Sequence, residues 1–184
     1  MKEKIFYAGI VPEKISKNLE EICKTISFNL SIRGFTLRTF GSRNFKNSFE
    51  IGCDIDQGEK EVFYPFFSDE IKQDRENHKI FFADELYEKN NNILYDMLKK
   101  TKGLDKSETL CLMSFLHCLF GKDFLNTKEM SKFFIFYYPQ GEIKNFLIEM
   151  AKILNIFYID LSEPKWNCDY NISKILKVTD NFKN

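Results

Sequence analysis

The stretch FTLRTFGSRNFKNSFEIG, residues Phe35–Gly52, decides how the rest of the chain is interpreted. Its first six residues, Phe35–Phe40, are aromatic, β-branched or long, which predicts a strand. The strand breaks at Gly41 and Ser42, and apolar residues then recur at the four-residue spacing of one helix face. These residues are Phe45, Phe49 and Cys53. The stretch therefore predicts a strand, a glycine-containing turn and a helix.

A turn of this kind directs free backbone N–H groups and the positive end of a helix dipole toward one point, where an anion can bind. Two cations, Arg43 and Lys46, lie in or beside the predicted first turn of the helix. The dipole disfavours cations there by roughly 0.3 kcal/mol or more each, so their presence favours a bound anion. The alternative is an ordinary strand–helix turn with solvated cations, and the motif itself leaves both interpretations open.

The same alternation of strand and helix continues on both sides of this stretch. The other predicted strands are Lys4–Ile10, Lys60–Pro65, Phe133–Tyr138 and Phe157–Leu161. The predicted helices run from Glu13 to about Arg33, over Leu104–Gly121 and from Gly141 onward. Alternating strands and helices at this spacing form right-handed crossovers. We therefore expect an α/β fold with a mostly parallel five-stranded sheet and helices on both faces.

Residues Phe66–Lys106 interrupt the alternation. They are charged and irregular, with an Asn90–Asn92 run and one apolar patch at Ile80–Ala83. We interpret them as an insertion, residues 66–106, that carries a helix around Asn91–Lys100. The insertion is expected to lie over the carboxyl ends of the strands as a lid or an interface within a single domain, residues 1–184.

Composition excludes several classes of function. The 27 basic and 27 acidic residues give a net charge of zero, which argues against binding nucleic acid through a basic stripe. The five Cys include no CxxC pair, and no cluster with metal-ligand spacing is present, so we expect free thiols, a cytoplasmic location and no metal. No apolar run reaches membrane length. His117 lies within an apolar run and is expected to be packed rather than catalytic.

The assembled segments resemble the SLOG-type Rossmann-like proteins, which are related to the DprA and LOG (lysine decarboxylase-like) families. The matching segments are YAGI at Tyr7–Ile10, GFTLRT at Gly34–Thr39, SFE at Ser48–Glu50, KEVFYP at Lys60–Pro65, LFGKDF at Leu119–Phe124 and MAKILNIFYIDL at Met150–Leu161. The resemblance covers about four fifths of the chain. It implies a Rossmann-like domain, a nucleotide-derived ligand and a homo-oligomer; many such proteins are carried by phages.

The chain departs from the family pattern in its loops. Ile10 runs almost directly into Val11-Pro12, so the first loop is short. The glycine-rich loop that LOG-type enzymes need is reduced to Gly141–Asn145, and Glu149 lies too far along the helix for the family's catalytic role. Ser114-Phe115 stand where the family pattern has the adjacent residues Arg-Asn. Because a shared fold does not transfer chemistry, the resemblance favours ligand binding over catalysis.

The leading prediction is a non-catalytic protein, with no cofactor, that binds or sequesters a nucleotide-derived ligand at the carboxyl ends of the strands. If a phage encodes it, the ligand would be a nucleotide immune signal in the host cytoplasm. The residues assigned to the ligand are Gly9, Arg38, Gly41, Ser42, Arg43, Gly141 and Asn145. Arg38 is expected to end its strand and to form two parallel hydrogen bonds to a phosphate.

Three alternatives stay open. A LOG-type nucleotide or nucleoside N-glycosidase would use Glu50 and Glu149 as acid or base. A DprA-like protein would stack single-stranded DNA on its many aromatic side chains. An inhibitory interaction protein would use the insertion, or the aromatic residues Phe66, Phe67 and Tyr87, as its contact surface.

Overall fold

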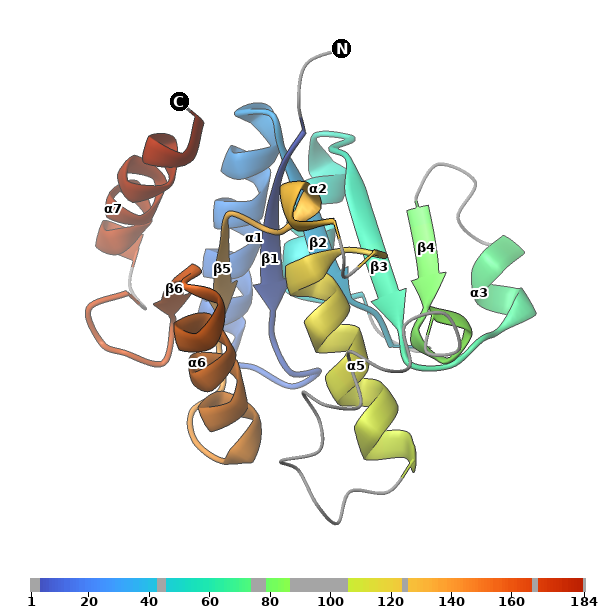
Figure 1. The fold of residues 1–184 in the computed structure, drawn as a ribbon. Coiled ribbons are helices and arrows are strands. Elements are labelled where there is room, and N and C mark those ends of the chain that lie inside the picture. Colours follow the sequence, from blue (N-terminus) through green and yellow to red (C-terminus); the bar gives the residue numbers. More distant parts are fainter. Residues whose placement is uncertain are drawn as a thin grey trace.

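The computed structural model describes residues 4–42, 46–73, 79–86, 106–123, 126–166 and 169–183. In these residues all strands belong to one six-stranded parallel sheet in the order β4-β3-β2-β1-β5-β6 (Figure 1). The strands are β1 (Ile5–Ile10), β2 (Phe35–Phe40), β3 (Lys60–Tyr64), β4 (Lys79–Phe82), β5 (Phe133–Phe136) and β6 (Phe157–Asp160). The predicted α/β, Rossmann-like fold class is confirmed.

The sheet has one strand more than the five predicted. The additional strand is β4, which pairs with β3 at the edge of the sheet, Val62 opposite Ile80 and Tyr64 opposite Phe82. Part of the segment interpreted as an insertion is therefore an element of the fold. A run of four residues is too short to separate strand from loop by its pattern, and the pairing with β3 makes it a strand.

Helices cover both faces of the sheet, as predicted. One face carries α1 (Lys17–Ile32), α2 (Ser48–Ile55) and α7 (Asp169–Asp180), and the other carries α5 (Lys106–Phe120) and α6 (Glu142–Leu154) (Figure 1). The short α3 (Asp69–Gln73) packs Ile71 beside β3 and β4. The remaining helical parts of the described chain are residues 83–86 and the 3₁₀ turns η1 (Thr127–Glu129) and η2 (Asn181–Lys183).

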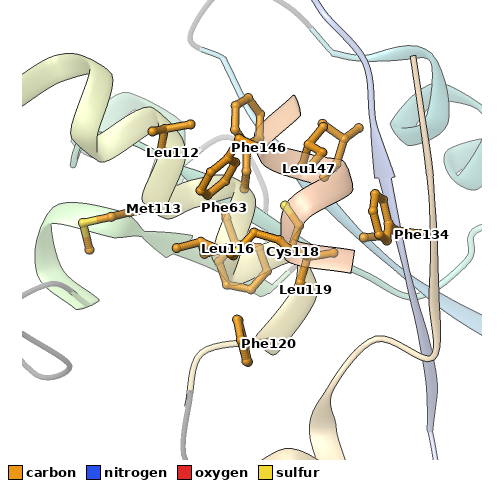
Figure 2. Packing of buried hydrophobic residues seen from close by; sticks show 14 of the residues in the cluster. Phe63, Leu112, Met113, Leu116, Cys118, Leu119, Phe120, Phe134, Phe146 and Leu147 are labelled. Carbon is orange, nitrogen blue, oxygen red and sulfur yellow. The ribbon is translucent and has the colours of Figure 1, made fainter. Parts of the chain in front are cut away.

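The alternation of side chains along each strand divides the interior into two cores. Tyr7 of β1 joins the core under α1 and α2, whereas its neighbour Ala8 joins the core under α5 and α6. In the second core, shown in Figure 2, Phe63 of β3 meets Leu116 of α5, and Phe146 approaches from α6. Because strands buried on both faces read as continuous apolar runs, the sequence FFIF of β5 suits its central place in the sheet.

Helix α1 begins at Lys17, four residues later than predicted from Glu13. Its N-cap is Ser16, whose Oγ accepts a hydrogen bond from the backbone N–H of Leu19 at 3.3 Å. The helix ends at Arg33, and Gly34 follows with φ +82°, as predicted for a glycine after the helix end. The late start leaves Pro12–Ile15 as a loop beyond the carboxyl end of β1, so Glu13 stands outside the helix.

The order in which the chain adds strands to the sheet reverses once. From β1 it builds outward to β4, and it then returns to place β5 on the other side of β1. In open parallel sheets, ligands bind outside the carboxyl ends of the strands. The arrowheads of β1 and β3 in Figure 1 mark that edge, at the lower side of the view. Among the helices of the described residues, none combines the length and apolar character that a membrane crossing needs.

Candidate functional site

A pocket of about 490 Å³ opens at the carboxyl ends of β2 and β3. Its walls come from the last residues of these two strands, from the loop before α1 and from α3. The lining residues are Glu13, Phe40, Gly41, Ser42, Tyr64, Pro65, Phe66 and Ile71. The pocket therefore lies on the ligand-binding edge of the sheet, beside β2 and β3 rather than at the point between β1 and β5 where the strand order reverses.

Three of the residues that line the pocket are aromatic. Tyr64 is buried, Phe40 is half-buried, and Phe66 is exposed at the mouth. A Cβ atom at Gly41 would overlap the ring of Tyr64, so only glycine lets this ring lie against the backbone of the turn. The backbone N–H of Gly41 donates to Phe63 O at 2.9 Å, which holds the turn in line with the sheet. The result is an apolar slot bounded by rings and backbone.

Glu13 and Ser42 supply the polar groups of the wall. The hydroxyl of Ser42 donates a hydrogen bond to Oε1 of Glu13, which ties the loop before α1 to the turn after β2. Glu13 is the one charged side chain among the lining residues. Within the part of the chain that the structure describes, its Oε2 has no hydrogen-bond partner. A carboxylate accepts hydrogen bonds only, so this wall is suited to a ligand with N–H or O–H groups.

Arg38 is not at this site, which corrects the expectation that it ends a strand with a free guanidinium. It is the fourth residue of β2 and is fully buried toward α5. Its Nε donates to Glu61 Oε2 at 2.7 Å, its Nη1 donates to Glu129 O, and its guanidinium lies 3.6 Å from the ring centre of Phe6. Burial lowers the pKa of Arg38, and the Glu61 carboxylate opposes that shift.

The helix after the turn also differs from the predicted anion site. It begins only at Ser48, and its N-cap is Asn47, whose Oδ1 accepts from the backbone N–H of Glu50 at 3.1 Å. With the N–H of Gly41 bonded as well, two of the predicted anion donors already have protein partners. Lys46 pairs with Asp54 at 3.1 Å. Arg43 lies outside the described residues, so its predicted role stays a prediction.

The other assigned residues lie apart from the pocket. Gly9 is buried in β1, where a Cβ atom would come within 2.6 Å of the Phe49 ring, so it serves the contact between the sheet and α2. Gly141 and Asn145 are exposed at the start of α6, on the other side of β1. Of the residues assigned from sequence that the structure describes, only Gly41 and Ser42 line the pocket.

Neither carboxylate proposed for N-glycosidase chemistry reaches the pocket. Glu50 is fully buried between α2 and β3, where it pairs with Lys60 at 3.2 Å. Glu149 is exposed on α6. Neither is a lining residue. No group of three or more His, Cys, Asp or Glu within the described residues is placed to hold a metal ion.

Most of the pocket escaped the sequence analysis. The sequence predicts Phe40 and Tyr64 as strand residues and Glu13 as a helix residue, and it offers Phe66 only as a residue of a protein contact surface. One signal was present: aromatic residues occupy the last position of two neighbouring strands, with a glycine directly after the first of them. Neighbouring parallel strands end at the same edge of a sheet, so both residues had to lie at that edge, although Phe40 faces the core under α5 and Tyr64 faces the side of α3.

Comparison with known proteins shows no matching family model and no matching curated protein. Two solved structures resemble the fold. The Moco carrier protein of Chlamydomonas rheinhardtii has 12% identity and a TM-score of 0.49, over 98% of this chain and 86% of that one. The molybdenum cofactor binding protein of Rippkaea orientalis has 16% identity and a TM-score of 0.38, over 94% and 98%. At these values the comparison does not bear on ligand or activity.

Proposed function

We propose that this protein binds a small molecule with a planar aromatic ring, of the nucleotide-derived class, in the pocket at the ends of β2 and β3. The observation that carries the proposal is a pocket of about 490 Å³ whose lining includes three aromatic residues, Phe40, Tyr64 and Phe66. Ligand pockets typically measure about 300–1,000 Å³ and are mostly apolar with a few polar groups. This pocket meets both descriptions and lies on the edge of the sheet where such ligands bind.

Stacking supplies the expected binding energy. A base stacked on an aromatic side chain gains about 1–3 kcal/mol, as measured by alanine substitution. Phe66 is the side chain best placed for this contact because it is 41% exposed at the mouth. Pro65 and Ile71 are buried and add apolar surface to the lining. A flat heterocycle fits such a slot better than a flexible chain, because little conformational entropy is lost on binding.

The chemistry of the wall favours binding over catalysis. Acid–base catalysis needs groups placed to donate and to accept a proton at the reacting atoms. Among the lining residues Glu13 is the single carboxylate, and none of them is His, Lys or Cys. The N-glycosidase alternative therefore has no pair of carboxylates here. Product formation from a nucleoside monophosphate would bring that alternative back.

Calorimetry with a panel of nucleosides, mononucleotides, cyclic dinucleotides and ADP-ribose derivatives tests the proposal. Phe66→Ala is expected to weaken binding of the best panel member by about 5- to 150-fold, the equivalent of the stacking energy. The matched control is Phe157→Ala, which removes an equally exposed ring, 40%, from β6 on the far side of the sheet. If no panel member binds, or if both variants weaken binding equally, the proposal is wrong.

The finer parts of the sequence-based prediction stay part of this proposal. They are membership of the SLOG-type proteins, sequestration of a nucleotide immune signal by a phage-encoded protein, and assembly into a homo-oligomer. A copurified ligand, identified by mass spectrometry of the native protein, tests the second part directly. Light scattering of the same sample tests the third.

A further inference from the structure

Resting on the proposed function, we infer that Glu13 selects the ring of the ligand. It favours heterocycles that present adjacent amino and imino N–H groups on one edge, as guanine does, over heterocycles such as adenine that present an acceptor there. The inference names the class of ligand within the pocket and assigns specificity to one side chain.

The position of Glu13 follows from the start of α1. Because Ser16 caps the helix and Lys17 begins it, Glu13 lies on the loop beyond β1 and not on a helix face. From this loop it lines the pocket whose floor is built from β2 and β3. The hydroxyl of Ser42 donates to Oε1 and thereby holds the carboxylate at the pocket wall. A carboxylate has about four lone-pair positions, so the bond from Ser42 leaves most of them for a ligand.

The chemistry of recognition follows from this carboxylate. Two parallel N–H groups of a ring match the two oxygens of a carboxylate, and hydrogen bonds to a charged acceptor are the stronger kind. The corresponding edge of adenine combines an acceptor nitrogen with an amino group. The lone pair of that nitrogen would face the negative charge of the Glu13 carboxylate. Hypoxanthine offers one N–H group in place of two. The expected order of affinity is therefore guanine first, hypoxanthine second and adenine last.

The charge of Glu13 also sets the direction in which the ligand lies. With this carboxylate as the one charged group among the lining residues, a phosphate group is repelled from this wall. The ring edge therefore faces Glu13, the ring face lies against Phe66, and the phosphate points out of the pocket. A site that relies on hydrogen bonds to a ring edge rejects analogues that lack the donors far more strongly than an apolar slot does.

The test compares GMP, IMP and AMP by calorimetry with the wild type, Glu13→Gln and Glu142→Gln. We expect the wild type to bind GMP at least tenfold more tightly than AMP, with IMP between them. Glu13→Gln should remove most of the preference for GMP, because the amide offers one acceptor and one donor in place of two acceptors. Glu142→Gln, which neutralises an exposed carboxylate in the first turn of α6, should keep the preference.

Phe66→Ala separates the failure of this inference from the failure of the proposed function. If the wild type binds the three nucleotides equally, Glu13→Gln changes nothing and Phe66→Ala weakens all three, the pocket role stands and the role of Glu13 is wrong. If the wild type binds none of them but binds another panel member through Phe66, the guanine class is likewise wrong. Binding that neither Phe66→Ala nor Glu13→Gln changes overturns both. Because Glu13 is exposed, its variant is expected to unfold at the wild-type temperature, which thermal denaturation verifies.

Discussion

Arg38 and Glu61 form an ion pair in the interior, between β2 and β3. Removing one member of such a pair costs about 3–5 kcal/mol, because it leaves the other charge buried without compensation. The end of α5 is shaped around this pair: a Cβ atom at Gly121 would lie 2.6 Å from Nη2 of Arg38. Nη1 of Arg38 also donates a hydrogen bond to Glu129 O, which connects Arg38 to the segment before β5. Arg38 therefore joins three segments of the fold and has no path to a ligand at the opposite edge.

His117 provides a prediction on the dependence of stability on pH. Its ring is buried and stacked on Phe63, with Nδ1 2.8 Å from Gly121 O. Burial lowers the pKa of His117 from 6.5 to about 4; the bond to Gly121 opposes this shift, and the charge of Arg38 adds to it. Between these two values the unfolded chain binds the proton and the folded protein does not, so the stability that the neutral ring provides is lost as pH falls from 6.5 toward 4.

We expect the free energy of unfolding of the wild type to fall by about 2 kcal/mol more between pH 7 and pH 4.5 than that of His117→Gln. Urea denaturation of both proteins at the two pH values measures this difference in the free energy of unfolding. Comparing the two proteins cancels the contribution of the carboxylates, which both proteins share. An equal fall in both proteins would mean that His117 is protonated in the folded state at pH 4.5.

Arg43 provides a prediction on the phosphate end of the ligand. It follows the pocket residue Ser42 directly in the sequence. A guanidinium that bonds to a phosphate contributes about 1.5–3 kcal/mol. We therefore expect Arg43→Ala to weaken binding of a nucleotide about tenfold or more, and to leave the affinity for the matching nucleoside and the melting temperature unchanged.

The comparison of nucleotide and nucleoside separates this role from a contribution to folding. Calorimetry of both ligands with the wild type and Arg43→Ala decides it. Equal loss for nucleoside and nucleotide would assign Arg43 to the ring or to the fold, and no loss for either would remove it from the site.

Among the secondary-structure elements, α2 depends most on contacts outside itself. It has eight residues, and isolated helices shorter than about 12–15 residues are marginal in water. Its interior face carries Glu50, which pairs with Lys60 of β3, and Phe49, whose ring covers Gly9 of β1. Its N-cap, Asn47, is tied to the preceding strand. The helix that follows the glycine turn is thus held by the sheet and in turn fixes the turn beside the pocket.

Asn47→Ala is expected to cost about 2–4 kcal/mol of stability. The side chain caps α2 through Glu50 N and donates from Nδ2 to Thr39 Oγ1 at 2.6 Å and to Phe40 O at 2.8 Å. The loss combines a cap, worth about 1 kcal/mol, with the two hydrogen bonds from Nδ2 to buried acceptors of β2. The matched control is Ser16→Ala at the exposed N-cap of α1, which should cost about 0.5–1 kcal/mol.

Chemical denaturation of the two cap variants and the wild type measures these costs. Asn47→Asp adds a second comparison, because it keeps an oxygen for the cap but lacks the N–H donors to β2. Costs of equal size for Asn47→Ala and Ser16→Ala would mean that the bonds to Thr39 and Phe40 contribute nothing to stability.

For the molecule as a whole, the single sheet predicts a pattern of hydrogen exchange. The inner strands β1, β2, β3 and β5 are paired on both sides, so their amides should exchange most slowly. Binding in the pocket should slow exchange around Glu13 and over residues 64–73, the side of the molecule that carries α3. Exchange at Gly141–Asn145, across β1 from the pocket, should not change.

Exchange measured by mass spectrometry, with and without saturating GMP, tests this pattern and the interpretation of residues 66–106 as a lid or interface. Phe66→Ala is the control, because it should abolish the protection while leaving the slow exchange of β1 intact. Protection by GMP at Gly141–Asn145 alone would move the site to the start of α6 and contradict the assignment of the pocket.

The sequence by itself determined the order and the type of the principal elements. Apolar runs such as FFIF of β5 and the helical spacing of Leu19, Ile22 and Ile26 are local patterns, and burial on one or both faces requires them. Gly34 likewise revealed the end of α1, because its positive φ is a property of one residue. Alternation of these elements was enough to predict a parallel α/β sheet.

Only the tertiary structure decided which side chains meet. The partner of Arg38 is Glu61, 23 residues away, and its third contact, Glu129, is 91 residues away. The same holds for β4, whose four residues become a strand by pairing with β3, and for Glu13, which reaches the pocket because Ser16 starts α1 late. Contacts between residues distant in the sequence leave no periodic pattern in it. The pocket proposed as the ligand site is built from such contacts, so the sequence predicted the edge of the sheet but not the pocket.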